Sequence, residues 1–197
     1  MNISRKEIDD LIKPGYVIAV EYLKPDCISR GLAWGQGGGA THALCCLGGL
    51  DIVEATALGV YETNLHNYLR GNCRLTVRRS RISASQEQVE KATDFWDARV
   101  LDPYDWRMIF GSIPILLAHK VIGLFSKRLA DEAVHKMPNL LASSILSTCA
   151  ELGIRGIRKF DESACSLYFA EDVDPEVLQT DDSLVTVIVL IGATLVG

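Results

Sequence analysis

The feature that most constrains this chain is a β-hairpin signature near its start, ATHALCCLGGLDIVEAT, over residues 40–56. Two apolar segments meet at Gly48-Gly49, and a glycine pair between apolar runs is typical of a hairpin turn. Each segment carries one ionisable side chain, His42 on the first and Glu54 on the second. Polar groups in an apolar hairpin need a hydrogen-bonding partner, so these two residues are candidates for a site.

The length of the turn decides whether the two side chains meet. With a three-residue loop, Gly48–Leu50, Leu44 lies opposite Glu54 and His42 lies opposite Thr56. His42 and Glu54 are then diagonal neighbours on one face, about 7–8 Å apart and within reach of each other. With a two-residue loop they point to opposite faces, so a paired arrangement requires an odd loop or a bulge. The alternatives are a histidine satisfied in the core and a solvated glutamate at a strand end.

Hydrophobic periodicity and turn residues predict an α+β chain in which strands precede most of the helices. Ser4 with Glu7 and Ser85 with Gln88 form capping boxes, which predict helices over residues 3–13 and 85–101. The other predicted elements are, in chain order, strands at 16–23, 41–47, 51–56 and 59–63, a helical turn at 65–69, a strand at 73–80, a mostly helical region at 106–137, a helix at 143–152 that stops at Gly153, a turn at 171–175 and a final strand at 184–190.

Length and composition narrow the class of protein. A chain of 197 residues favours a single domain over residues 1–197. The net charge is −5 and the only basic cluster is at 78–81, so nucleic-acid binding has no electrostatic support. The six cysteines sit in apolar runs without a CxxC pair, which indicates reduced core cysteines, with adjacent Cys45 and Cys46 on opposite faces of a strand. A zinc site of His42, Cys45 or Cys46, and Cys73 matches no common ligand spacing, and we expect no metal or cofactor.

Two segments approach the apolar character of a membrane span. Residues 111–125 are interrupted by Pro114, His119 and Lys120, and the tail at 183–197 is short and β-branched, so both predict buried elements. The first segment also suggests peripheral membrane contact or a lipid substrate. The N-terminus lacks the apolar core of a signal peptide, and we expect a cytoplasmic protein or one exported without a classical signal peptide.

Short motifs occur in a fixed order over nearly the whole chain: Pro14-Gly15-Tyr16, Thr41-His42, Gly48-Gly49, Glu54-Ala55-Thr56, Tyr104-Asp105 and Asp174-Pro175. In these motifs the chain resembles the circularly permuted NlpC-type papain-like hydrolases of the YaeF/YiiX branch, which are related to the lecithin retinol acyltransferase-like proteins. It departs from them at Tyr16, where the family has aspartate. The resemblance implies a permuted papain-like fold, a small antiparallel sheet or barrel packed against helices, with a helical insertion at about 106–137.

The family's nucleophile is a cysteine at the start of a late helix, which corresponds here to residues 141–153. The register that keeps the apolar positions on the core side puts Ala142 in its place, and a shift by one residue would put Ser143 there. Alanine cannot be a nucleophile. The alternatives are a Cys→Ala variant, a naturally inactive protein, or a nucleophile elsewhere in the chain, for which Cys165 is the best candidate.

The resemblance implies a triad of cysteine, histidine and glutamate formed by position 142, His42 and Glu54. A cysteine at a helix N-terminus favours the thiolate, and a histidine oriented by a carboxylate can carry its proton. The reaction would be hydrolysis or transfer at an amide, ester or thioester bond of a cell-wall peptide or a lipid acyl group. The alternative is a non-catalytic protein that holds a peptide or acyl ligand on the same scaffold.

Overall fold

The computed structural model describes residues 2–26, 29–31, 33, 38–56, 58–104, 149–166, 175–192 and 194–196. The helical insertion predicted at about 106–137 lies outside these residues, as do Ala142 and Ser143. The single domain over residues 1–197 and the insertion therefore stay predictions.

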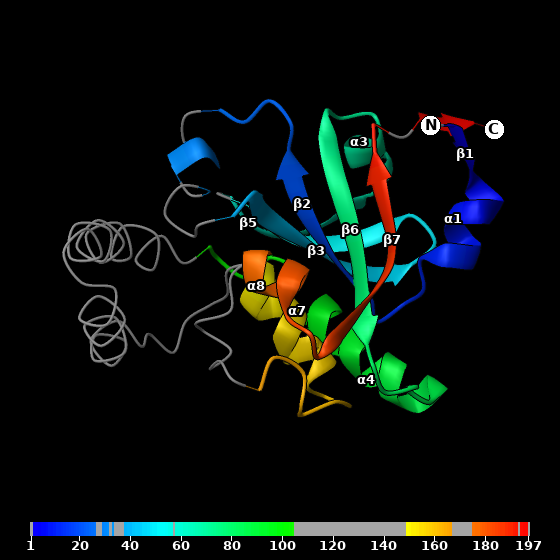
Figure 1. The fold of residues 1–197 in the computed structure, drawn as a ribbon. Helices are drawn as coiled ribbons and strands as arrows, with labels where there is room; N and C mark the ends of the chain where they lie inside the picture. Colours follow the sequence, from blue (N-terminus) through cyan, green and yellow to red (C-terminus); the bar gives the residue numbers. More distant parts are fainter. Residues whose placement is uncertain are drawn as a thin grey trace.

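The centre of the fold is an open, antiparallel sheet of six strands (Figure 1). From edge to edge the strands are β5 (Gly59–Asn64), β4 (Asp51–Thr56), β3 (Ala40–Gly48), β2 (Val17–Tyr22), β6 (Cys73–Ser80) and β7 (Leu184–Ile191). The predicted α+β class is confirmed, and the sheet is open rather than closed into a barrel. The short strands β1 (Asn2–Ser4) and β8 (Thr194–Val196) pair in parallel and bring the two ends of the chain together.

Helices cover both faces of this sheet. The face that carries Val17, Ala43 and Cys45, here called the α7 face, packs against α4 (Gln86–Asp97), α7 (Cys149–Ile157) and α8 (Pro175–Thr180). The opposite face, here called the α3 face, carries Leu44 and Cys46 and packs against α1 (Arg5–Leu11) and α3 (His66–Leu69). Adjacent Cys45 and Cys46 thus belong to different cores, as predicted, and both are buried thiols that form no disulfide.

Both capping boxes predicted from the sequence are present in the structure. Ser4 caps α1 with Glu7, and Ser85 caps α4 with Gln88, each as a complete capping box. The predicted helix at 3–13 began too early because residues 2–4 pair with β8 instead. The helix predicted to reach 101 ends at residue 97, where a turn begins.

The stop predicted at Gly153 is wrong, because α7 continues through this residue to Ile157. A Cβ atom on Gly153 would lie 3.1 Å from Val17 Cγ1, and one on Gly156 would lie only 2.2 Å from Trp96 Nε1. Both glycines therefore let α7 pack closely against the sheet and against α4. Glycine is needed here for tertiary packing, and helix propensity, which depends only on the local sequence, does not predict such contacts.

The C-terminal part departs from expectation in two ways. Pro175, assigned to a turn, begins α8. Proline is well suited to the first helical position, because the N–H group that it lacks would have no partner within the helix there. The final strand exists as predicted but is an edge strand. Leu184 and Leu190 are buried, whereas Val189 and Ile191 are 44% and 48% exposed, so the strand is only partly buried. Among the described residues, no helix has the length and apolar character needed to cross a membrane.

Candidate functional site

A β-bulge sets the register of the hairpin that carries the site. Leu44 pairs with Glu54, as expected, but Gly48 pairs with Asp51, so the loop has two residues and the three-residue loop was wrong. The register shifts between Cys46 and Gly48, and this bulge adds the residue that the shorter loop lacks. Gly48 and Gly49 have φ angles of 140° and 57°, which favour glycine. The parity that brings His42 and Glu54 to one face is therefore kept.

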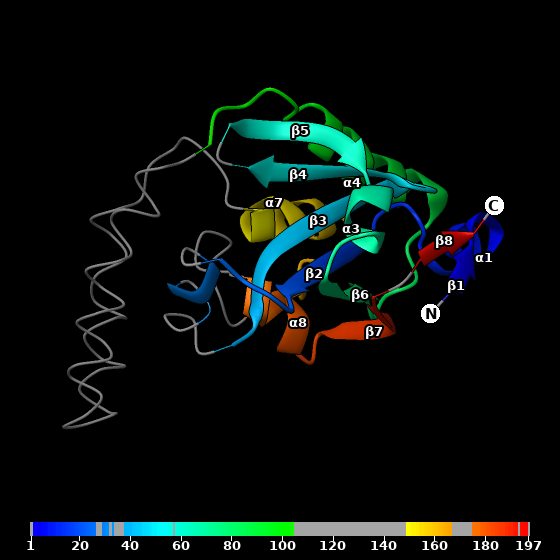
Figure 2. The ribbon, with the colours of Figure 1, turned by 90° about the horizontal axis from the view of Figure 1, so that it is seen from above.

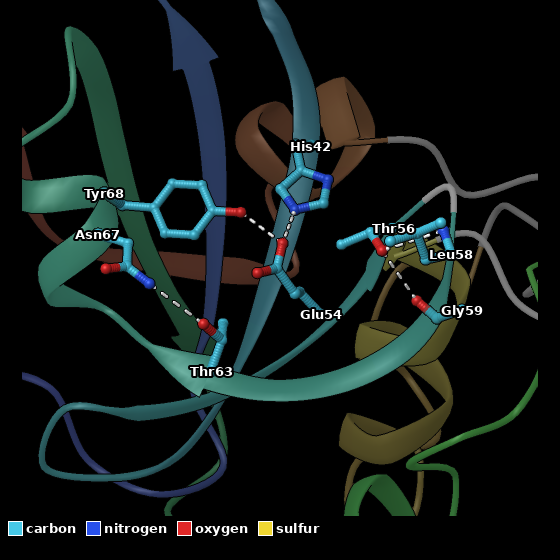
Figure 3. Close-up of polar contacts among 8 residues, drawn as sticks. All are labelled: His42, Glu54, Thr56, Leu58, Gly59, Thr63, Asn67 and Tyr68. Atoms are coloured by element: carbon cyan, nitrogen blue, oxygen red, sulfur yellow. Dashed lines mark hydrogen bonds and ion pairs between the residues drawn. The ribbon is translucent and has the colours of Figure 1, made fainter.

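His42 and Glu54 form a hydrogen-bonded pair on the α3 face (Figure 3). The imidazole Nε2 lies 2.7 Å from Glu54 Oε2, and the two side chains are only 14% and 11% exposed. An ionised carboxylate can only accept hydrogen bonds, so Nε2 carries the proton in this contact. Glu54 therefore engages Nε2 and not Nδ1, and it fixes the orientation of the ring.

Glu54 stays ionised although it is nearly buried. Burial by itself raises the pKa of this carboxyl, but the hydrogen bonds from His42 and Tyr68 and the charge of His42 outweigh it. The net effect is a pKa below the ordinary value for glutamate. A carboxylate held in this way stabilises a protonated imidazole beside it, which is what a proton-carrying histidine requires.

Tyr68 of α3 is a member of the site that sequence reasoning missed. Its hydroxyl donates to Glu54 Oε2, and its ring stacks on the imidazole of His42 with centroids 5.9 Å apart and planes 16° apart. The helical turn that carries it was predicted at 65–69, but no motif linked that turn to the hairpin. The only available signal was an aromatic residue between buried Leu65 and Leu69.

His42 lies at the end of the sheet where β3 and β4 separate. The pairing of these strands ends at Leu44 and Glu54, and Figure 2 shows β3 curving away from β4 with α7 seen between them. A second register shift occurs beside His42, because Val20 pairs with His42 but Glu21 pairs with Ala40. The backbone around the imidazole is therefore irregular on both sides.

The N-terminal end of α7 points toward the end of the sheet that carries His42. Gly153, in the middle of α7, lies against Val17. Phe160, just after the helix, lines a pocket together with Gly15 and Tyr16, which immediately precede β2. Since β2 and β3 are antiparallel, α7 must begin toward the end where β3 starts, which is the end that carries His42. The helix contacts both β3 and β4.

Glu176 of α8 holds the first residues of β3. Its Oε2 accepts a hydrogen bond of 3.1 Å from the backbone N–H of Ala40, and a Cβ atom on Gly38 would collide with its carboxyl group. This carboxylate therefore fixes the backbone two residues before His42. The contact links residues 136 positions apart, so sequence reasoning did not find it.

Cys165, the alternative nucleophile, does not belong to this site. It is buried on the α7 face, and its backbone N–H donates to Ser183 Oγ over 2.7 Å. Ser183 precedes Leu184, which pairs with Ser80 at the opposite end of the sheet from His42. Burial and the nearby charge of Asp181 also raise the pKa of Cys165 to about 11, which disfavours the thiolate.

The other candidates give a mixed result. Tyr104 packs against the core on the α7 face, whereas Asp105 lies outside the described residues, as do Ala142 and Ser143. In the part of the chain that the structure describes, no group of three or more His, Cys, Asp or Glu side chains is placed to hold a metal ion.

Comparisons with known proteins place the chain in no established family. No family model matches its sequence, and no curated protein is significantly similar to it. Among solved structures, it is similar to the crystal structure of metalloprotein yiiX from Escherichia coli O157:H7, DUF1105. The match has a TM-score of 0.48 and 17% sequence identity, and it covers 90% of this chain and 97% of that one. A likeness this weak carries no argument about the site.

Proposed function

We propose that this scaffold serves acyl transfer, with His42 as the proton carrier and Glu54 as the group that orients it. The observation that carries the proposal is the nearly buried pair itself, with Nε2 of His42 2.7 Å from Glu54 Oε2. A histidine oriented by an ionised carboxylate is the base and the orienting group of a nucleophilic triad. The third member is a cysteine thiol at position 142, where this chain has alanine.

The chemistry of such a triad follows from these positions. The thiol at 142 gives its proton to Nδ1 of His42, and the thiolate attacks the carbonyl carbon of an amide, ester or thioester. The imidazolium then protonates the leaving amine, alcohol or thiol as the old acyl bond breaks. Water or a second acceptor attacks the resulting thioester and gives its proton to His42, which restores the thiol as the acyl group leaves.

The course of α7 supports position 142 as the source of the nucleophile. α7 begins at Cys149, seven residues after Ala142, and its start points toward the end of the sheet that carries His42. The imidazole lies on the α3 face, whereas α7 packs on the other face.

Acyl-enzyme formation tests this function. The Ala142→Cys protein is incubated with activated esters, fatty acyl thioesters and acylated cell-wall peptides, and the intact and digested masses are measured. We expect an acyl adduct on residue 142 that disappears when His42 is also changed to alanine. No adduct from any substrate class, or an adduct that persists without His42, would reject the proposal.

Alanine at position 142 itself favours a second function, that of a non-catalytic protein which binds a peptide or acyl ligand. In that case the chain as it stands binds fatty acid or peptide in calorimetry, and the Ala142→Cys protein binds equally well without becoming acylated. Acylation of the variant would favour the enzyme instead.

A further inference from the structure

We propose that Tyr68 is a positioning residue of this site, which holds Glu54 against the imidazole of His42 and keeps the imidazole in one plane. The catalytic purpose of this positioning rests on the proposed function, whereas the contacts of Tyr68 with Glu54 and His42 do not depend on it. The Tyr68 hydroxyl donates to Glu54 Oε2, the same oxygen that receives Nε2 of His42 (Figure 3). Its ring stacks on the imidazole with planes 16° apart.

Two donors on one oxygen restrict the carboxylate more than either donor alone. The side chain of Glu54 cannot rotate away from His42 without also giving up the bond from Tyr68. The stacked ring restricts the other partner, because the imidazole can tilt only by losing its contact with the phenol ring. Tyr68 thus acts on both members of the pair at once.

The backbone of Tyr68 is itself held in place. The N–H of Tyr68 donates to the carbonyl of Leu65 over 3.0 Å, and the carbonyl of Tyr68 accepts from the thiol of Cys73 over 3.0 Å. Leu65 and Leu69 on either side of it are buried in the core of the α3 face. A residue fixed in this way can transmit the position of α3 to the site on β3 and β4.

The electrostatic effect of Tyr68 can be separated from that of its neighbours. The groups that lower the pKa of Glu54 are His42 on β3 and Tyr68 on α3. Tyr61 on β5 is the cross-strand partner of Glu54, but its hydroxyl donates to the carbonyl of Leu58 over 3.0 Å. Tyr61→Phe is therefore a matched control, since it also removes a tyrosine hydroxyl near Glu54, but one that does not donate to the Glu54 carboxylate.

Carboxyl carbon and imidazole nitrogen NMR titrations of the chain as it stands test the inference. In Tyr68→Phe, which keeps the ring, the pKa of Glu54 should rise, because the hydroxyl no longer stabilises the ionised form. In Tyr61→Phe it should stay unchanged. In Tyr68→Leu, which also removes the stacked ring, the nitrogen signals of His42 should shift from the Nε2–H form toward a mixture of both tautomers.

The outcomes separate this inference from the proposed function. A Glu54 titration that is the same in Tyr68→Phe as in the unchanged chain, or one that moves equally in Tyr61→Phe, overturns the role of Tyr68. That result can occur even if Ala142→Cys forms an acyl-enzyme. Conversely, the expected titrations without any acyl-enzyme would retain Tyr68 as the group that positions the pair and reject the acyl-transfer function.

Discussion

The meeting of His42 and Glu54 depends on a single bulged residue. The side chains of a strand alternate between faces, so a shift of one residue between β3 and β4 would send one of them to the α7 face. The bulge near Gly48 adds one residue to β3 and compensates for the two-residue loop. The pair is thus a product of backbone geometry at residues that take no part in the contact.

A change of Glu54 to glutamine should show how much the pair with His42 contributes to the free energy of unfolding. At neutral pH we expect the free energy of unfolding to fall by about 1–2 kcal/mol, because a charge-assisted hydrogen bond in a nearly buried site is lost. The pKa of Glu54 lies below its ordinary value in the folded state. Its contribution is therefore complete above the unfolded pKa of about 4.3 and is lost as the pH falls through the lower folded value.

Urea unfolding between pH 5 and pH 3 measures this difference. The gap between the unchanged protein and Glu54→Gln should shrink toward pH 3. Glu62→Gln, an exposed change on β5, serves as the control and should alter stability by no more than about 0.5 kcal/mol. A gap that widens as the pH falls would contradict the assigned direction of the pKa.

At the scale of elements, α7 is joined to α4 through a close contact at glycine. Trp96 of α4 is fully buried, and its Nε1 donates to the carbonyl of Leu152 over 2.8 Å. A methyl group on Gly156 would occupy the space of the indole ring. This contact fixes the position of α7 on the sheet and hence the direction in which its start points.

Gly156→Ala should therefore destabilise the protein although alanine favours helices. We expect a loss of about 1–3 kcal/mol, because the indole ring must move within a packed core. Gly31→Ala is the matched control, since a Cβ atom there meets no atom within 4 Å. A shift of the urea midpoint that is no larger for Gly156→Ala than for the control would contradict the packing argument.

The connection between α8 and β7 is organised by Arg78 of β6. This buried guanidinium donates to the carbonyls of Gln179 and Leu184 over 2.6 and 2.8 Å, and also to the carbonyl of Asp181. The basic cluster at 78–81 thus contains one guanidinium that is used inside the fold.

Arg78→Lys should be strongly destabilising even though it keeps the charge. A lysine has no planar fork and cannot reach several carbonyls at once, so we expect a loss of about 2–4 kcal/mol from unsatisfied buried groups. Arg81→Lys, an exposed change three residues away, should cost no more than about 0.5 kcal/mol. Equal urea midpoints for the two variants would show that the fork is not required.

At the scale of the whole molecule, local patterns predicted most of the strands and both capping boxes. The hairpin, the strands predicted at 59–63 and 73–80, and the α+β class followed from alternation and turn residues, and the first of these strands extends to Asn64 in the structure. The contacts that complete the site come from other elements, from Tyr68 of α3, 14 residues after Glu54, and from Glu176 of α8, 136 residues after Ala40, and no local pattern encodes them. The length of α7 was missed for the same reason, because its glycines are required by close packing against the sheet and against Trp96.

The pairing of the two chain ends is also a long-range feature. β1 and β8 join residues 2–4 to 194–196, and Ile3, the middle residue of β1, is buried. Removal of residues 194–197 should speed the hydrogen exchange of the amides at 2–4 by roughly tenfold or more, which corresponds to about 1.4 kcal/mol. Amides of β2 should be unaffected. Unchanged exchange at 2–4 would mean that β8 does not stabilise the N-terminal strand.

The central claim is that the His42–Glu54 pair serves a nucleophile at position 142, and thiol reactivity tests it most directly. Iodoacetamide labelling is followed against pH in the unchanged chain, in Ala142→Cys, and in Ala142→Cys with His42→Ala, and peptide masses locate the label. We predict labelling at 142 with an apparent pKa well below the free-cysteine value of about 8.5, and ordinary reactivity once His42 is removed. Ordinary reactivity at 142 with His42 present, or preferential labelling of Cys165, would contradict the account.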